Sequence, residues 1–549
     1  MQDSQVDEQL QTTVLIVGCG PSGMTTALCL SQFGIRSLLI DRHSEISDAP
    51  RAHALNCRTL EIFSSLGIDL AHLRELATPD EESGWVRWVD TLSGGEFGVV
   101  PYERMNATET VPTAHPLFNI AQPDAEAVLY AAVQADPNIR VEREWQWNSC
   151  SQNNAAVDSL IVTGGSQRIA VHSDYLIAAD GANSAVRESQ NIEMEGPGVI
   201  QKFKNIHFRA DLSALVQHKP AILYWVLHQS YPGTFIAYNM RNNWTFMFPY
   251  DPATTDPLSL SEEVCLRLTK GAIGSPDIAL EIVSIRDWEL TSEVASSYRS
   301  GRVFLVGDAA HRYPPSGGLG LNTGVGDAHN LAWKIAGVLT GWAGEALLDS
   351  YDSERRPVAN HNAAFSLENA MKMLDVFTHA GVFAAPGEQP SLQALQADTS
   401  QWDSLQASIE DQRVHFDGLA LHLGAHYGRT EAPDPFTREL QCAQPGARLP
   451  HVWVNAKGER ISSHDLISAG QFTLLVPASS DVDPASLPAH WQMRRASEDF
   501  HADATALQAL GLGSASVLVR PDGHIAALLP TSEALKNTLL SIAEAGIAA

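Results

Sequence analysis

TVLIVGCGPSG, at residues 13–23, is the stretch that decides the fold class, and MTTALCLSQFGIRSLLID carries the pattern on to residue 41. A short run of β-branched residues that ends in glycine predicts a buried parallel strand. Apolar residues at helical spacing follow, closed by Gly34 as a C-cap, and a second strand ends in Asp41. These elements make one β-α-β unit, which predicts an α/β domain built around a parallel sheet.

Three glycines, Gly18, Gly20 and Gly23, stand between that strand and the helix. Glycines allow a tight turn and let the backbone approach a pyrophosphate, for which the helix N-terminus supplies N–H donors and a positive dipole. Asp41, with Arg42 beside it, stands where an acid accepts hydrogen bonds from a ribose. An ordinary glycine turn is disfavoured because strand, helix, second strand and acid are all in place. The motif predicts a dinucleotide site and does not distinguish NAD from FAD.

The overall composition excludes several classes of protein. Apolar residues make up 44% and charged residues 18% of the 549 residues, which is typical of a packed globular protein of about three domains. The 64 acidic residues exceed the 36 basic ones, and the net charge of −28 argues against nucleic-acid binding and anionic membrane surfaces. No apolar run is long enough for a membrane span, and the polar N-terminus lacks a signal-peptide pattern.

The cysteines indicate the redox compartment. They stand at positions 19, 29, 57, 150, 265 and 442, and none belongs to a C-x-x-C pair. This scatter predicts reduced thiols in a cytoplasmic protein, with no disulfide frame. We therefore expect no metal site.

Two segments far from the first unit favour a flavin. RVFLVGD at 302–308 predicts a strand whose last residue, Asp308, would bind a ribityl hydroxyl. PPSGGLGLN at 314–322 leads into a helix whose first N–H groups would face the pyrimidine ring of a flavin and stabilise the charge of its reduced form. A plain turn is the alternative. A third segment, Asp180-Gly181 followed by Arg187, fits either a cofactor contact or a strand-end turn with a structural salt bridge.

Together, GCGPSG at 18–23, YLIAADGANSAVR at 175–187 and VGDAAHRYPPSGGLGLNTGVGDAHNLAWKIA at 306–336 carry a family resemblance. Over about residues 12–370 the chain resembles the class A flavoprotein monooxygenases, the aromatic hydroxylases typified by para-hydroxybenzoate hydroxylase and phenol hydroxylase. The resemblance implies bound FAD, NADPH or NADH as reductant, O2 as oxidant and a small aromatic, phenolic substrate. In that family the ring is hydroxylated through a C4a-hydroperoxyflavin.

The resemblance also implies an architecture. We expect an α/β fold with a Rossmann-like FAD-binding domain, an inserted and mostly antiparallel substrate sheet, and a C-terminal thioredoxin-like domain. PGARLPHVWV and VLVRPDG look like that last domain in larger phenol hydroxylase relatives, here without redox cysteines. The expected parts are 1–190 for the first FAD-binding segment, with an excursion into the substrate domain near 78–115; 191–290 for the substrate sheet; 291–372 for the second FAD-binding segment; 373–440 for a helical linker; and 441–549 for the thioredoxin-like domain.

Positions that match the family's motifs imply which residues bind FAD. The ADP part would lie against the glycine loop and Asp41, and the ribityl chain against Gln122 and Asp308. Pro315 matches the loop proline whose carbonyl faces the reactive edge of the flavin, so we expect it to belong to the catalytic residues. The full set expected to bind FAD is Gly18, Gly20, Gly23, Asp41, Arg42, Arg51, Gln122, Asp180, Asp308, Gly318, Gly320, Leu321 and Asn322.

Hydroxylation of a phenol requires its oxygen to be deprotonated or strongly hydrogen-bonded, and histidine suits this task. His53 is similar to the histidine that the hydroxybiphenyl hydroxylase branch uses, and we expect it to be catalytic. Where that branch tends to carry an acid, this chain has Asn119, which positions an oxygen and is no base. Trp225 would wall an aromatic pocket and Arg241 would bind an anionic group; core packing and surface pairing are the alternatives for these two residues.

The sequence leaves other functions open. The same flavin chemistry serves oxidative decarboxylation or dearomatisation of a natural-product intermediate, and a non-catalytic flavin- or lipid-binding protein would share the fold. A flavin halogenase is disfavoured because Trp85-Val-Arg-Trp88 does not match the W-x-W-x-I-P motif. A homodimer is expected by analogy alone, and nothing in the sequence chooses between NADH and NADPH.

Overall fold

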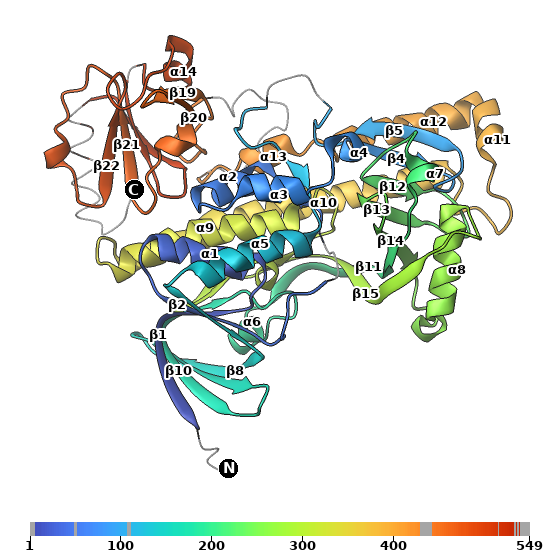
Figure 1. Cartoon of the computed structure of the whole chain (residues 1–549), viewed down its shortest axis with the longest axis horizontal. Helices are drawn as coiled ribbons and strands as arrows, with labels where there is room; N and C mark the ends of the chain where they lie inside the picture. The colour runs from blue at the N-terminus through green and yellow to red at the C-terminus, as the bar shows by residue number, and fades with distance from the viewer. Residues whose placement is uncertain are drawn as a thin grey trace.

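A computed structural model describes residues 6–48, 52–106, 111–428, 442–513 and 515–531, together with Ala534 and Asn537. Within these residues, two eight-stranded sheets and a smaller four-stranded sheet organise the chain (Figure 1). The mixed α/β fold expected from the sequence is confirmed.

The first sheet contains the β-α-β unit predicted from residues 13–41. Its strands β17, β10, β1, β2 and β7 run parallel in that order, and β16, β9 and β8 extend it with antiparallel pairs. Helices α1, α5 and α9 cover one face (Figure 1). The bounds are β1 Glu8–Val17, α1 Pro21–Gln32, β2 Ser37–Asp41, α5 Gln122–Ala135, β7 Ile139–Arg143, β8 Trp145–Gln152, β9 Val157–Thr163, β10 Arg168–Ala178, β16 Arg299–Ser300, β17 Val303–Leu305 and α9 Leu319–Leu339.

The second sheet has the order β18-β15-β11-β14-β13-β12-β4-β5. Its pairs are antiparallel except for β12 with β4, and β4 and β5 come from the early segment near 78–115. The bounds are β4 Trp85–Val89, β5 Glu96–Pro101, β11 Met194–Arg209, β12 Leu223–Val226, β13 Gly233–Asn239, β14 Asn243–Tyr250, α8 Glu262–Ile273, β15 Glu281–Ala295 and β18 His311–Arg312.

Two expected domain boundaries fall inside long elements. β15 crosses position 290, because it and β11 are long strands that run from the second sheet back to the first (Figure 1). α10, at Asp349–His379, crosses position 372 and extends over the second sheet. Shorter elements complete this part of the chain: β3 Ala54–Leu55, α2 Cys57–Ser65, α3 Leu70–Leu76, α4 Asp80–Ser83, β6 Phe118–Asn119, α6 Ala185–Ser189, α7 Ser213–Val216, α11 Leu392–Ala397, α12 Thr399–Glu410 and α13 Leu419–Leu423.

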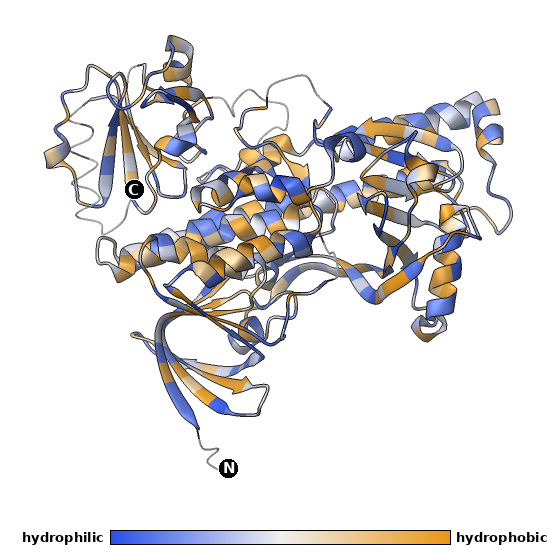
Figure 2. Cartoon of the chain, in the orientation of Figure 1, coloured by the Kyte–Doolittle hydropathy of each residue, from blue (hydrophilic) through white to orange (hydrophobic). Residues whose placement is uncertain are grey.

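The C-terminal sheet has the order β22-β21-β23-β24. β21 and β22 are parallel, whereas β23 pairs antiparallel with both β21 and β24. Its strands are rich in apolar residues, as the orange segments in Figure 2 show. The bounds are β19 Trp453–Ala456, β20 Glu459–Ser462, β21 Phe472–Val476, β22 Trp491–Arg495, α14 Ala504–Ala509, β23 Ser516–Val519 and β24 Ile525–Leu529.

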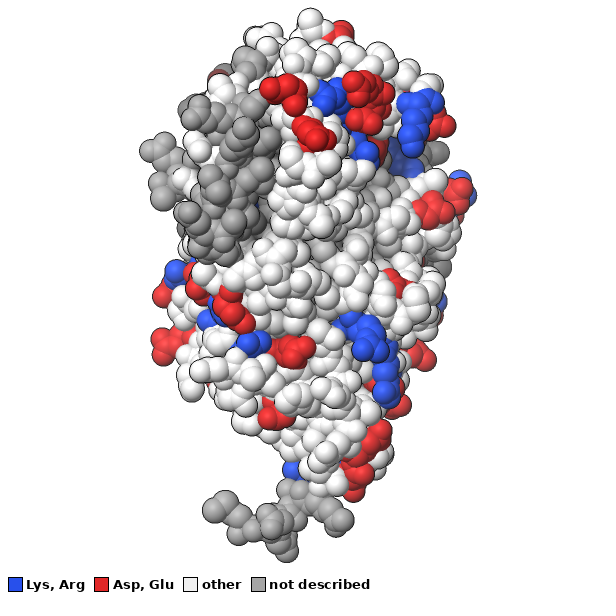
Figure 3. All heavy atoms as spheres, turned by 90° about the vertical axis from the view of Figure 1, so that its left-hand side faces the viewer, with Lys and Arg blue, Asp and Glu red and all other residues white. Residues whose placement is uncertain are grey.

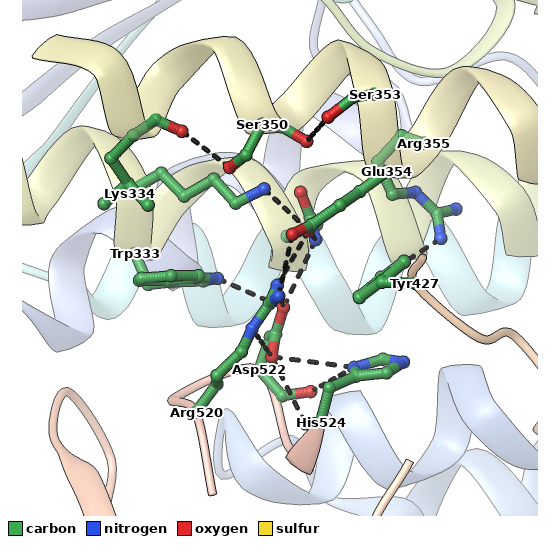
Figure 4. A network of polar contacts seen from close by, with 12 residues as sticks. Trp333, Lys334, Ser350, Ser353, Glu354, Arg355, Tyr427, Arg520, Asp522 and His524 are labelled. Atoms are coloured by element: carbon green, nitrogen blue, oxygen red, sulfur yellow. Dashed lines mark hydrogen bonds and ion pairs between the residues drawn. The ribbon is translucent and has the colours of Figure 1, made fainter. Parts of the chain in front are cut away.

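The C-terminal sheet docks on α9 and the segment that follows it through an apolar cluster in which Trp333 packs with Phe472. A buried polar network lies beside this cluster (Figure 4). Arg520 donates to both oxygens of Glu354 at 2.8 Å each, and Lys334 donates to the same carboxylate at 2.7 Å. Each buried charge of this junction therefore faces an opposite charge.

Acidic and basic side chains are interspersed on the molecular face that Figure 3 displays, around a middle with few charges. The net charge of −28 is thus not gathered into one patch on that face. None of the helices in the described residues combines the length and apolarity that crossing a membrane requires. All six cysteines are free thiols.

Candidate active site

A cavity of about 1260 Å³ runs from the glycine loop after β1 to the inner face of the second sheet. The carboxyl ends of β1 and β2, the start of α5 and the loop before α9 form one end of it. Strands β12, β13 and β14 and helix α10 form the other end. The cavity thus joins the predicted cofactor site to the predicted substrate sheet.

The glycine loop has the shape that a pyrophosphate requires. A Cβ on Gly18 would lie 2.1 Å from the Ala179 carbonyl oxygen, and one on Gly23 would lie 2.0 Å from the Gly18 oxygen. Gly20, the N-cap of α1, has open space where its Cβ would stand. The loop therefore packs tightly on the protein side and leaves room for the pyrophosphate above the helix N-terminus. These residues fit a dinucleotide such as FAD.

The loop before α9 forms the second part of the cradle. Gly317 and Gly318 adopt φ values of +94° and +61°, which only glycine adopts easily, and the chain then enters α9 at Leu319. The N–H groups of the first helical turn have no partner within the helix, and Leu319, Gly320 and Leu321 line the cavity. This arrangement fits the expected contact with a pyrimidine ring.

The side chain of Asn322 forms hydrogen bonds within the protein, and the expected contact of this residue with FAD stays a prediction. Its Nδ2 donates to the carbonyl oxygens of Ala54 and Gly318, at 3.0 and 2.6 Å, and its Oδ1 accepts from Asn56 N–H at 3.0 Å. The side chain is therefore engaged in tying the segment 52–56 to the start of α9. This tie also fixes the position of His53, the chain neighbour of Ala54.

The other predicted cofactor residues line the cavity, apart from one. Asp41 accepts the Cys19 N–H at 2.8 Å, so it also holds the glycine loop. Asp180 accepts from Ser184 Oγ at 2.5 Å, which supports the strand-end turn. Arg51 lies outside the described residues. The predicted residues that do line the cavity here are Asp41, Arg42, Gln122, Asp180 and Asp308, and their contacts with FAD stay predictions.

Pro315 lines the cavity where the loop turns toward the second sheet. Its carbonyl oxygen accepts the Gly318 N–H at 3.0 Å. A carbonyl oxygen has two lone pairs, so one acceptor position is left for a ligand. The predicted role of Pro315 at the reactive edge of the flavin is compatible with this geometry and stays a prediction.

His53 lies inside the cavity, with part of its ring open to it. Its Nδ1 is 2.8 Å from Asn119 Oδ1, and Asn119 Nδ2 in turn faces Met105 Sδ at 3.4 Å. Because an amide oxygen only accepts, Nδ1 carries the proton and Nε2 is the acceptor. Burial lowers the pKa of His53, against the hydrogen bond that its Nδ1 donates to Asn119, so the ring is neutral at neutral pH.

Asn119 and Arg241 do not lie where direct substrate contact requires. Asn119 is fully buried behind His53 and does not line the cavity, because β3 pairs with β6 and places it there. Arg241 is exposed in the turn between β13 and β14, where its N–H donates to Asn239 Oδ1. Arg241 is not among the residues that line the cavity, which favours the alternative of a surface role, and its expected role stays a prediction.

Trp225 lies on the cavity wall, as predicted, and packs edge-on against Phe377 with ring centroids 6.1 Å apart. Its Nε1 has no hydrogen-bond partner among the described residues. Apolar and aromatic side chains from four elements complete this end of the cavity, which we call the substrate chamber. They are Leu223, Ile236, Tyr238, Met247, Met373 and Phe416.

Sequence reasoning missed two acid–base groups of the chamber, Glu103 and His415. Glu103 stands in a turn, PYERMN, that carries no motif. Its surroundings come from residues more than 300 positions away, since Gly418 N–H donates to its carboxylate at 3.0 Å. No local pattern signals such a contact.

Two family models match the chain. The model described as FAD binding domain matches residues 11–366, and the one described as aromatic-ring hydroxylase, C-terminal, matches residues 443–545. Together they cover both ends of the molecule and most of the residues that line the cavity.

Similar proteins cover almost the whole chain. The 2,4-dichlorophenol 6-monooxygenase of Cupriavidus pinatubonensis is 30% identical over 94% of this chain and 93% of its own length. The tetracenomycin B2 monooxygenase-dioxygenase of Streptomyces olivaceus is 32% identical over 86% and 85%. The flavin-dependent monooxygenase PieE, solved with FAD and substrate, is 29% identical with a TM-score of 0.90 over 99% of this chain and 100% of its own. The chain therefore belongs to the FAD-dependent aromatic-ring hydroxylases, monooxygenases that use a reduced nicotinamide and O2.

Proposed function

We propose that this protein hydroxylates a phenolic ring that His53 holds by its oxygen. The observation that carries the proposal is the Nε2 atom of His53, which the hydrogen bond between Nδ1 and Asn119 leaves as an acceptor inside the chamber. An acceptor at this position draws the phenol proton and makes the ortho and para carbons electron-rich. FAD, held by the glycine cradle, supplies oxygen activation when bound.

The position of His53 beside the α9 loop supports this role. A Cβ on Gly318 would lie 3.3 Å from Ala54 Cβ, and Asn322 bonds to the Ala54 carbonyl. The segment that carries His53 therefore packs directly on the loop expected to hold the flavin ring. A phenol bound to His53 would lie between that loop and the wall formed by Trp225.

The substrate class follows from the chamber and from the relatives. One relative is named for 2,4-dichlorophenol and another for a tetracenomycin, so simple and polycyclic phenols are both represented. The chamber wall is mostly apolar and aromatic. Among the described residues, Arg286 and Arg312 are the only arginine or lysine residues of the second sheet that line the cavity. We infer a neutral, apolar phenol in preference to a carboxylated one.

A panel of matched phenols and methyl ethers tests the function. The purified flavoprotein would be supplied with NADPH or NADH, isotopically labelled O2, and either 2,4-dichlorophenol or 2,4-dichloroanisole. We expect labelled oxygen in the phenol product and none from the ether, which has no proton to give to His53. Equal oxygenation of the ether would overturn the role of His53, and nicotinamide oxidation without label in any phenol of the panel would overturn the hydroxylase proposal.

We also propose that the C-terminal sheet belongs to a thioredoxin-like domain with a structural task. Its four strands mix parallel and antiparallel pairs around β21, and no cysteine follows Cys442 in the sequence. A redox role would need a thiol pair. We also propose that the protein forms a homodimer and lies in the cytoplasm, as expected from the sequence. Light scattering of the holoenzyme tests the dimer.

A further inference from the structure

Glu103 is a buried carboxyl group of the chamber, and the role proposed above for His53 leaves its function unexplained. Its side chain is 4% exposed, and its Oε2 accepts the Gly418 N–H at 3.0 Å. Glu103 and Arg104 have φ values of +46° and +57°, in the left-handed region that residues other than glycine rarely adopt. Backbone strain of this kind persists where the surrounding structure imposes it, and it concentrates at functional sites.

The surroundings of Glu103 favour its protonated form. Burial raises its pKa to about 8 against the hydrogen bond from Gly418, and Asp417 raises it further while Arg104 lowers it. Asp417 is itself paired with Arg104 at 2.7 Å. Glu103 therefore holds a proton at neutral pH. The other titratable side chains around it are Tyr102, Cys57 and His422.

His422, on α13, lies on the other side of Glu103. Its Nδ1 is 3.9 Å from Glu103 Oε2, slightly beyond hydrogen-bond range, and has no hydrogen-bond partner among the residues that the structure describes. The ring is 2% exposed, and burial lowers its pKa to about 4. A neutral imidazole accepts a proton at one nitrogen and releases one from the other, so His422 is suited to pass protons on.

His422 also lines a second cavity, of about 50 Å³, beneath the C-terminal domain. Asn330 Oδ1 and His524 Nε2, two further wall atoms, lack partners within the described part of the chain. A polar cavity of this size with unsatisfied groups holds ordered water. The remaining polar wall residues include Arg58, Arg355, Arg448 and Asp522.

We propose that Glu103 and His422 carry protons between the substrate chamber and the water of this second cavity. The purpose of the path rests on the proposed function. As the O–H bond of a phenol breaks, His53 Nε2 takes its proton. One carboxyl oxygen of Glu103 then takes that proton from His53 across the chamber, and the proton on the other oxygen moves to His422 Nδ1. His422 then releases the proton on Nε2 to water. One proton leaves the chamber, one phenolate stays, and nothing is oxidised.

The path supplies a carboxyl group, which position 119 lacks in this sequence. Asn119 orients His53 but takes no proton, so a carboxyl group has to come from elsewhere in the chamber. The path also gives the C-terminal domain a part in the reaction, because Arg448, Asp522 and His524 of that domain close the second cavity.

The experiment is a pH jump on the holoenzyme without substrate, followed by infrared absorption of protonated carboxyl groups. After a jump from below pH 8 to above it, the wild-type protein should lose the infrared band of one protonated carboxyl group. Glu103→Gln should lack this band. Glu410→Gln is the matched control, since it makes the same chemical change at an exposed carboxyl group of α12, outside the chamber, and it should keep the band. A band that persists in Glu103→Gln would overturn the proposal.

The rate of that loss tests the second half of the path. His422→Gln should slow it by at least about tenfold, in line with the contribution of a positioned acid–base group. Gly418→Ala is a second variant: its backbone accepts alanine at φ −82°, but the new Cβ would lie 2.7 Å from His422 Nε2 and displace the ring. Unchanged rates in both variants would mean that the proton leaves through the chamber, which overturns the path. Because no phenol is present, this result is independent of the substrate panel.

Discussion

The domain junction and the substrate chamber both bury polar side chains. The protein pairs the charged side chains of the junction with one another, whereas in the chamber it leaves polar atoms without a partner. At the junction, Glu354 receives four hydrogen bonds, from Asn330, Lys334 and Arg520, and Arg520 also pairs with Asp522 (Figure 4). In the chamber, His53 Nε2 has no hydrogen bond assigned in the described structure, and Trp225 Nε1 lacks a partner there.

This difference distinguishes buried polar groups that stabilise the fold from buried polar groups that can bind a ligand. A buried charge that the protein itself neutralises costs little once it is paired, and removing its partner costs much. A buried polar atom that the protein leaves without a partner carries a desolvation penalty that a ligand removes. The charges of the junction are therefore paired without a ligand, whereas the chamber leaves polar atoms that a ligand can pair with. The predictions below test this distinction in order of expected effect.

Arg520→Ala should have the largest effect, because it removes the buried charge that pairs with both Glu354 and Asp522. We expect a loss of about 3–5 kcal/mol in the free energy of unfolding. Denaturant unfolding of the holoenzyme measures it. Arg460→Ala, an exposed arginine of the same domain, should stay within about 0.5 kcal/mol of wild type. If the two variants lost equal stability, the paired network would not be what holds the junction.

His53→Ala should lower the rate of phenol oxygenation by about 100-fold while FAD stays bound. Burial lowers the pKa of His53, so the imidazole stays unprotonated as the pH falls through the ordinary histidine range. The wild-type rate should therefore stay level across that range and decline only at more acid pH. Label incorporation from O2 as a function of pH provides the measurement. An alanine variant with the wild-type rate would remove His53 from the mechanism, and His228→Ala, outside the cavity, is the control.

Asp308→Ala should weaken FAD binding by about 10- to 100-fold, as expected for the loss of one charged hydrogen bond. Asp308 stands at the strand end that faces the cavity. The ratio of flavin to protein after dialysis reports the effect. A variant that purifies with full flavin occupancy would contradict the ribityl assignment.

Arg241→Ala should change nothing in the chamber. The residue is exposed in the β13–β14 turn, and we expect kcat, KM and flavin content within about twofold of wild type, as for most surface substitutions. A large rise in KM would restore the anionic-substrate role that its position argues against.

The two regions also differ in how far the sequence predicts them. Gly18, Gly20 and Gly23 follow one strand and precede one helix, so spacing alone indicates their geometry. The walls of the chamber come from β12, β13, β14, α10 and the segment before α13, which no local pattern joins. An aromatic residue on a strand, such as Trp225, favours a pocket wall, whereas Glu103 carries no such signal.

The sequence by itself determined the α/β class and the dinucleotide cradle. Each of these depends on backbone geometry within a few residues, which glycine spacing and apolar periodicity encode. Only the tertiary structure decided that Asn119 orients His53 from behind, that Arg241 faces solvent, and that Glu103 meets Gly418 and His422. These contacts join residues 66 to 319 positions apart, and burial and charge at such sites follow from packing.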